Sequence, residues 1–187
     1  DVTATLSAVS GRNVTVDLAF GGDATQGDGN DYTCASSIVI NAGDESSSTA
    51  LTTVEDSLVE GDEAFTVDID SVTNGTEDGT QQVTGTIIDD ESATVAFQTA
   101  TSNPTEADTD SDHNIPVVLS TAGDGTPTLQ DAAEVTVSDD GTGSATANND
   151  YILGGTVTFA ADSGDGDTEN FELTIKGDDL DEDNEDV

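Results

Sequence analysis

Apolar residues along this chain fall into short runs that alternate with polar positions. Phe65, Val67 and Ile69 are each followed by a polar residue, a period of two that indicates a strand with one buried face. Val, Ile and Thr dominate these runs, and Gly, Asp, Ser and Asn fill the turns between them, which favours an antiparallel β-sandwich. The predicted strands cover residues 2–6, 14–20, 38–41, 48–54, 64–69, 82–88, 93–99, 114–119, 133–138, 156–159 and 170–176.

One sequence pattern occurs twice. Asn30-Asp31-Tyr32-Thr33 recurs as Asn149-Asp150-Tyr151-Ile152, and each copy leads into a strand-like run, an acidic Gly-containing turn and a second run. An acidic cluster closes the pattern, at residues 55–63 in the first copy and at residues 177–185 in the second. The repeat predicts an all-β chain of two tandem immunoglobulin-like sandwiches, residues 1–91 and 92–187.

The two copies are expected to be incomplete at opposite ends. The first has no counterpart of the run at 93–99, and the second has none of the runs at 64–69 and 82–88. The first sandwich should therefore lack its first strand and the second its last strands. Two explanations stay open: a piece of a longer tandem array, or neighbouring subunits that supply strands by strand addition.

The charge excludes some partners. Forty-one Asp and Glu face two basic residues, Arg12 and Lys176, for a formal charge of −39, which would repel nucleic acid and anionic membranes and attract cations. Such self-repulsion needs bound cations or salt, because the screening length falls from ~30 Å at 0.01 M to ~3 Å at 1 M. The composition thus indicates a halophilic or marine source. No apolar stretch of ~18 residues occurs, so we expect no direct membrane insertion.

The chain has few residues of the kinds that usually carry out catalysis. One histidine, His113, and one cysteine, Cys34, cannot build a zinc site or a convincing nucleophilic relay. Paired carboxylates could in principle hydrolyse a glycoside, but the chain has no Trp and no cleft-forming insertion. We therefore expect that the protein is not an enzyme.

Four elements in order resemble the Calx-beta family, known from the regulatory region of sodium–calcium exchangers and from large bacterial surface proteins. They are Asn30–Thr33, the turn Gly43-Asp44-Glu45, the acidic stretch Glu55–Phe65 and the closing stretch Thr86–Glu91. The resemblance covers most of the first ~90 residues and, more loosely, residues 92–187. It implies Calx-beta-like sandwiches that bind calcium.

Acidic loops explain physically how such a fold could bind Ca²⁺. The ion takes six to eight oxygen ligands and accepts irregular geometry, so that loops at one end of a sandwich can converge on it. The loop of Asp31, the cluster at 55–63 and the residues after the last strand would then meet. In the first copy, the resemblance implies as calcium ligands Asp31, Glu55, Asp56, Glu60, Glu63, Asp89, Asp90 and Glu91. In the second copy the matching residues are Glu106, Asp150, Asp178, Glu182 and Glu185, but Gly177 replaces the first acid of the cluster.

These features together predict a calcium-binding structural module. It would be a calcium-rigidified spacer or filament segment of a secreted or cell-surface protein, such as an adhesin, a surface-layer component or a matrix protein, adapted to high salt. Its expected partners are calcium ions and neighbouring repeats or subunits. Two alternatives remain: a calcium-sensing regulatory module of a larger protein, and a domain that binds carbohydrate or a receptor through bridging calcium.

Overall fold

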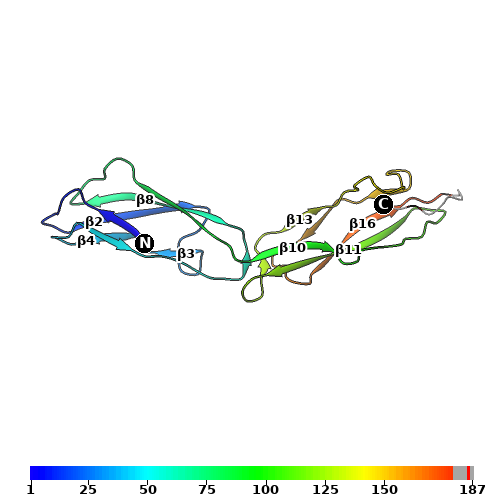
Figure 1. The fold of residues 1–187 in the computed structure, drawn as a ribbon, viewed down its shortest axis with the longest axis horizontal. Coiled ribbons are helices and arrows are strands. Elements are labelled where there is room, and N and C mark those ends of the chain that lie inside the picture. The colour runs from blue at the N-terminus through cyan, green and yellow to red at the C-terminus, as the bar shows by residue number, and fades with distance from the viewer. Residues whose placement is uncertain (179–184, 186–187) are drawn as a thin grey trace. The chain divides into compact units, whose positions relative to one another are not determined.

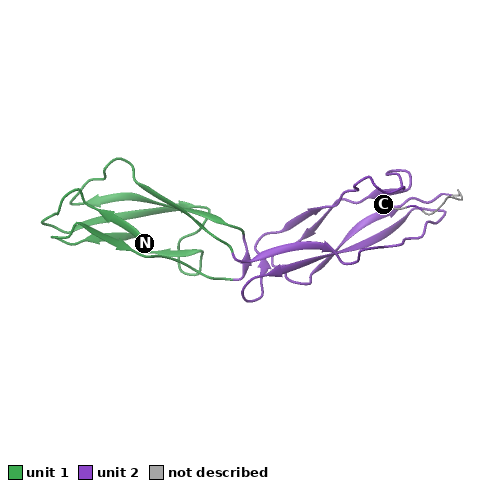
Figure 2. Cartoon of the chain, viewed as in Figure 1, with its two compact units in different colours: residues 1–56, 61–89 green, residues 57–60, 90–187 purple. Residues whose placement is uncertain are grey.

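The chain folds into two all-β units, seen in a computed structural model that describes residues 1–178 and residue 185 (Figure 1). Unit 1 comprises residues 1–56 and 61–89, and unit 2 comprises residues 57–60 and 90–187 (Figure 2). The described residues form strands, turns and loops, and among them no helix is long and apolar enough to cross a membrane. The predicted fold class, two tandem β-sandwiches, is confirmed.

Unit 1 consists of two strand layers. One is a four-stranded antiparallel sheet in the order β4-β2-β8-β9. The other contains the pairs β1-β5 and β3-β6, in which β5 and β6 are separated only by Ala50. The strands are β1 (Val2–Thr5), β2 (Val14–Gly22), β3 (Tyr32–Cys34), β4 (Ser37–Ile40), β5 (Ser46–Thr49), β6 (Leu51–Thr53), β8 (Glu63–Thr73) and β9 (Gln82–Ile87).

The core of unit 1 follows from strand alternation. Val14 and Val16 of β2 face Ile40 and Ile38 of β4 across the sheet, and all four side chains are buried. Val2, Ala4 and Leu6 pack against them from the other layer. Val39, between the two buried isoleucines, is 42% exposed, as the pleat requires.

Unit 2 is built in the same way. Its four-stranded sheet has the order β10-β11-β16-β14, and β13 pairs with β15 in the second layer. The pair of β7 with β12 is parallel and joins residues 57–60 to this unit. The strands are β7 (Leu58–Val59), β10 (Ser92–Phe97), β11 (Ser111–Ala122), β12 (Thr128–Leu129), β13 (Ala133–Thr136), β14 (Tyr151–Leu153), β15 (Thr156–Phe159) and β16 (Thr168–Ile175). Its core residues are Val117, Leu119, Leu129, Val157, Phe159 and Phe171.

Each of the eleven predicted strands is found as extended structure, with shifts of a few residues at the ends, but the run predicted at 48–54 is divided at Ala50 into two strands, β5 and β6. The structure adds four short strands, β3, β7, β12 and β14, of two or three residues each. Runs of this length carry no period that could be recognised in the sequence. Among the described residues, unit 1 contains no counterpart of β10, and unit 2 contains none of β8 and β9.

Replacement of Ile40 by Ala tests the assigned core. Ile40 is 1% exposed, so the truncation should lower the free energy of unfolding of unit 1 by about 2–5 kcal/mol. The neighbouring Val39→Ala is the matched control and should cost less than about 1 kcal/mol, because the side chain is already half in water. Denaturant titration monitored by circular dichroism measures both, and equal losses would contradict the assignment of faces.

Candidate metal centre

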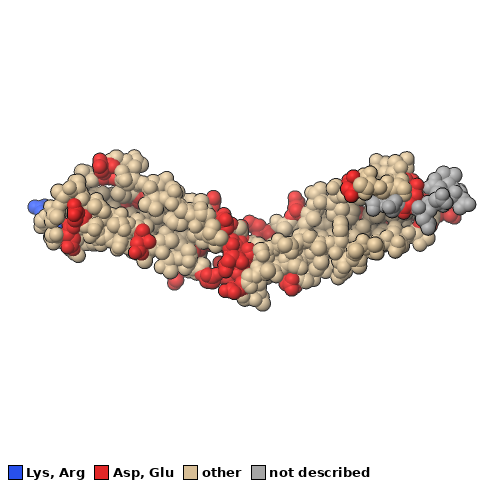
Figure 3. Space-filling model, in the orientation of Figure 1, with Lys and Arg blue, Asp and Glu red and all other residues tan. Residues whose placement is uncertain are grey.

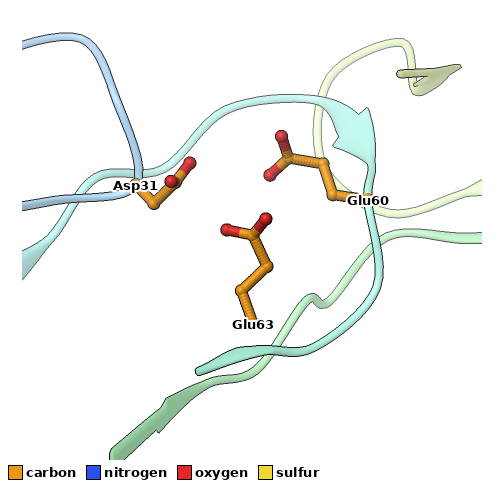
Figure 4. A group of neighbouring side chains, drawn as sticks. All are labelled: Asp31, Glu60 and Glu63. Atoms are coloured by element: carbon orange, nitrogen blue, oxygen red, sulfur yellow. The ribbon is translucent and has the colours of Figure 1, made fainter. Parts of the chain in front are cut away.

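Three acidic side chains from two loops and a strand of the first copy point toward one another. Asp31 lies directly before β3, Glu60 directly after β7, and Glu63 opens β8 (Figure 4). One carboxylate oxygen from each of the three lies within 4.8 Å of the others, and all three residues are half-buried. Asp31 is distant in sequence from Glu60 and Glu63, so the fold brings it to the other two.

Asp31 is held in place by the residue that follows it. Tyr32 is 0% exposed, and its ring packs on Phe20 and Phe65 with centroid distances of 6.2 and 5.5 Å. The backbone N–H of Thr25 donates to Asp31 Oδ2 at 2.5 Å, which orders the loop before it. Because a carboxylate has a second oxygen, Asp31 can satisfy this loop and still bind a cation.

Close approach of the loop to β8 depends on a glycine. Gly22 has φ of 110°, and a Cβ on it would lie 2.2 Å from the carbonyl oxygen of Ala64. That same carbonyl accepts hydrogen bonds from the N–H groups of Asp23 and Ala24, at 2.8 and 3.0 Å. The start of the Asp31 loop is thereby tied next to the residue that follows Glu63.

The closing segment of the first copy is tied to the same acidic loop. Asp89 Oδ2 accepts a hydrogen bond from the N–H of Gly61 at 2.6 Å, and the N–H of Asp89 donates to Asp62 Oδ1 at 3.1 Å. The three segments expected to converge, around Asp31, around residues 60–63 and at Asp89, thus all adjoin the start of β8.

The electrostatics of the cluster favour a cation. Burial raises the pKa of Glu63, and the negative charge of Asp31, a hydrogen bond to Asp31 and the charge of Asp23 raise it further. Ionised Glu63 is therefore destabilised by its surroundings. A divalent ion among these oxygens would reverse that effect, and carboxylate oxygens are the donors that Ca²⁺ prefers. The residues present thus fit calcium.

The other predicted ligands of the first copy are distributed over both units. Glu55 and Asp56 are exposed in unit 1, between β6 and β7, whereas Asp90 and Glu91 belong to unit 2. Within unit 2, carboxylate oxygens of Asp90 and Asp124 lie within 4.8 Å of each other. Glu91 Oε1 accepts a hydrogen bond from the N–H of Asp124 at 3.1 Å.

In the second copy, those predicted ligands that the structure describes are not gathered in this way. Asp150 Oδ2 accepts the N–H of Thr146 at 2.5 Å, as Asp31 does with Thr25. Glu106, Asp178 and Glu185 are exposed, and Glu182 lies outside the described residues. Among the residues that the structure describes, no group of three acids within ligand distance includes any of these positions.

The end of β16 explains part of this difference. A Cβ at Gly177 would lie 2.2 Å from the carbonyl oxygen of Ala107. The backbone of residues 107–109 therefore leaves no room for an acidic side chain at position 177, where the first copy has the first acid of its cluster. Next to it, Lys176 pairs with Asp110, and this contact lowers the pKa of the Asp110 carboxyl. A lysine side chain thus neutralises an acidic residue beside the end of β16.

Two acidic residues beside these ligands were not predicted from the sequence. Asp23 contributes to the raised pKa of Glu63, and Asp124 lies beside Asp90 and Glu91. Each follows a glycine in a short turn, Gly22-Asp23 and Gly123-Asp124. The sequence marks these positions as turns, and only the fold shows which acidic residues the turns approach.

The geometry defines a class: tandem β-sandwiches with acidic side chains gathered at the start of an inner strand, β8. The family model for the Calx-beta domain matches residues 2–91 and again residues 89–187. The chain therefore belongs to the Calx-beta domain family and carries two tandem copies of the domain.

Solved structures with a similar fold include two tandem segments. CBD12 from CALX1.2 is 18% identical with a TM-score of 0.40, and the match covers 92% of this chain and 67% of that one. Calcium binding domain CBD12 of CALX1.1 is 17% identical with a TM-score of 0.39, covering 94% and 68%. A search of curated proteins found no match.

The variant Glu63→Gln, studied without calcium, tests whether repulsion between the carboxylates destabilises the first domain. A raised folded-state pKa means that the folded chain binds more protons than the unfolded one, so stability falls as pH rises from the ordinary glutamate pKa through the raised value. With a chelator at pH 7, Glu63→Gln should therefore raise the melting temperature of unit 1 and flatten its decline above about pH 4. Asp44→Asn, at an exposed turn position, is the control and should leave that pH profile unchanged. A lower melting temperature for Glu63→Gln in chelator would contradict the inferred repulsion.

Proposed function

We propose that the first Calx-beta domain binds calcium through Asp31, Glu60 and Glu63. The observation that carries this proposal is the meeting of these three carboxylates within 4.8 Å, next to buried Tyr32, whose packing on Phe20 and Phe65 holds Asp31 in place.

Calcium at this centre would supply positive charge. It would offset the repulsion between the three carboxylates, and it would fix the Asp31 loop relative to the start of β8. Three carboxylates offer up to six oxygens, and main-chain carbonyls or water can complete the shell. Asp89, tied to Gly61, is a further candidate ligand, and Glu55, Asp56, Asp90 and Glu91 are proposed as additional or neighbouring ligands.

For the second domain we propose a weaker calcium site. Asp150 has the loop-capping role of Asp31, so a site there would have to be completed by Glu106, Asp178, Glu182 and Glu185. The ion pair of Lys176 with Asp110 already neutralises part of the local charge. Calcium is expected to bind this domain more weakly than the first.

The physiological role we propose is a calcium-rigidified spacer or filament segment of a secreted or cell-surface protein in a salty environment, not an enzyme. Tandem domains support it, because only residues 88–91 separate β9 from β10. The formal charge of −39, with red acidic side chains on both units in Figure 3, supports adaptation to high salt. Few aromatic residues disfavour the carbohydrate-binding alternative.

Removal of calcium should destabilise the first domain strongly. A ligand present at 100 to 1,000 times its Kd stabilises a domain by about 2.7–4.1 kcal/mol, and 1 kcal/mol corresponds to roughly 4–8 degrees at this size. EDTA in moderate salt should lower the melting temperature by well over ~10 degrees, measured by scanning calorimetry. No shift would rule out the calcium site.

The ligands can be separated from general charge effects. Asp31→Asn and Glu63→Gln should each abolish most of the calcium-induced shift, because each removes one of three converging carboxylates. Asp44→Asn removes the same charge at an exposed turn and should keep the shift. If all three variants behave alike, diffuse counterion binding and not a defined site accounts for the stabilisation.

Small-angle scattering distinguishes a spacer from a calcium sensor. A spacer should keep one scattering profile over the calcium range in which the site is full, since the bound ion fixes its loops. A sensor should change its profile at a threshold concentration near its Kd. Such a threshold would replace the spacer role with the regulatory one while leaving the calcium site intact.

A further inference from the structure

One strand edge of unit 2 has no partner among the described residues. β13 pairs only with β15, whereas β2, at the matching place in unit 1, pairs with β4 on one side and β8 on the other. The match between β13 and β2 follows from register. Val14 faces Ile40 and Ala133 faces Phe159, and β4 and β15 both follow the repeated Asn-Asp-Tyr motif.

A groove of about 300 Å³ lies along this edge. It runs between β10 and β13 and has largely apolar walls, with Val95 and Phe97 on one side, Val117 at the base and Val135 and Val137 on the other. Val95 is 38% exposed and Phe97 is 53% exposed, although both belong to a strand of the sandwich. Apolar side chains of this size next to an open strand edge indicate a surface that is normally covered.

Unit 1 shows what covers the matching place. The shift that superimposes the two Asn-Asp-Tyr motifs carries Val16–Ala19 of β2 onto residues 135–138, which line the groove. In unit 1 these β2 residues pair with β8: Val16 faces Val72, Leu18 faces Ile69 and Ala19 faces Asp68. The groove of unit 2 therefore lies where a β8-type strand is bound in unit 1.

We propose that this groove is a binding site for an extended polypeptide strand, which adds to the free edge of β13 and places alternate apolar side chains against Phe97 and Val117. The occupant has the chemistry of β8, in which Phe65, Val67 and Ile69 alternate with polar residues. Main-chain hydrogen bonds to β13 would give affinity, and the apolar groove would favour strands in which apolar and polar residues alternate. None of the proposed calcium ligands lines this groove.

Other occupants fit less well. The β8 strand of a second copy is already paired with β2 and β9, so it could be donated only if unit 1 opened. A small apolar ligand would leave the strand edge of β13 unpaired, and such an edge is a template for another strand. A free strand of alternating pattern satisfies both the edge and the groove.

The test uses the 187-residue chain and a synthetic peptide of residues 63–88, the β8–β9 hairpin of unit 1. The titration is followed by NMR in ~0.5 M NaCl, because screening is needed between two acidic chains. The peptide should bind with a stoichiometry of one, and shifts should concentrate at residues 92–97, 117 and 135–138. No saturable binding at ~1 mM peptide, or shifts confined to unit 1, would overturn the proposal.

Matched variants locate the binding. Phe97→Asp should weaken binding by at least about tenfold, because the apolar contact of a half-exposed ring is lost without disturbing the core. Val67→Asp in the peptide should weaken it similarly. The control is Val39→Asp on the edge strand β4 of unit 1, where the valine is 42% exposed, and binding should be unchanged. Loss of binding in Val39→Asp alone would move the site to unit 1 and overturn the proposal.

A final experiment tests whether the chain associates with itself through this groove. Sedimentation of the chain without peptide should show a monomer under the same salt conditions. A concentration-dependent dimer that disappears with Phe97→Asp would identify a second copy as the occupant and would overturn the proposed free strand.

Discussion

Repulsion between carboxylates that the fold forces together is the constraint on which the first domain depends. Two unit charges 4.8 Å apart repel by about 1 kcal/mol in water and roughly 3 kcal/mol at the dielectric of a protein surface, and three acids form three such pairs. The neighbourhood tolerates this because burial of Tyr32 between Phe20 and Phe65 and the close approach permitted at Gly22 stabilise the loop independently. Hydrophobic packing thus positions a cluster that electrostatics alone would disperse, and the cluster is then ready for a cation.

The two copies place the same tyrosine in different environments. Tyr151 donates to Asp139, which lowers the pKa of Asp139 and raises that of the Tyr151 hydroxyl to about 12. In the first copy the residue matching Asp139 is Phe20, and the buried Tyr32 hydroxyl has no hydrogen-bond partner among the described residues. One copy therefore holds its motif by a polar contact and the other by aromatic packing.

Strand alternation was sufficient to predict the sandwich, because each long strand buries alternate residues, as Ile38 and Ile40 do around Val39. It was insufficient for β7, where Leu58 and Val59 lie inside an acidic stretch and pair with the two-residue strand β12, far along the chain. The convergence of Asp31, Glu60 and Glu63 could be anticipated from the repeat and the resemblance. The roles of Asp23 and Asp124 could not, because a turn sequence does not specify which neighbouring side chains its loop approaches in the fold.

The charge that makes calcium necessary also bears on the open edge of β13. An unpaired strand beside exposed Val95 and Phe97 would ordinarily invite pairing between identical chains. A net charge of −39 on each chain opposes the approach of two copies. Repulsion thus hinders self-association at this edge, although no described residue covers it. Salt and calcium weaken that protection together, since both reduce the repulsion that a second polypeptide meets. Conditions that complete the metal centre of the first domain are therefore also those in which the second can accept a strand, although no direct contact between the two sites is required.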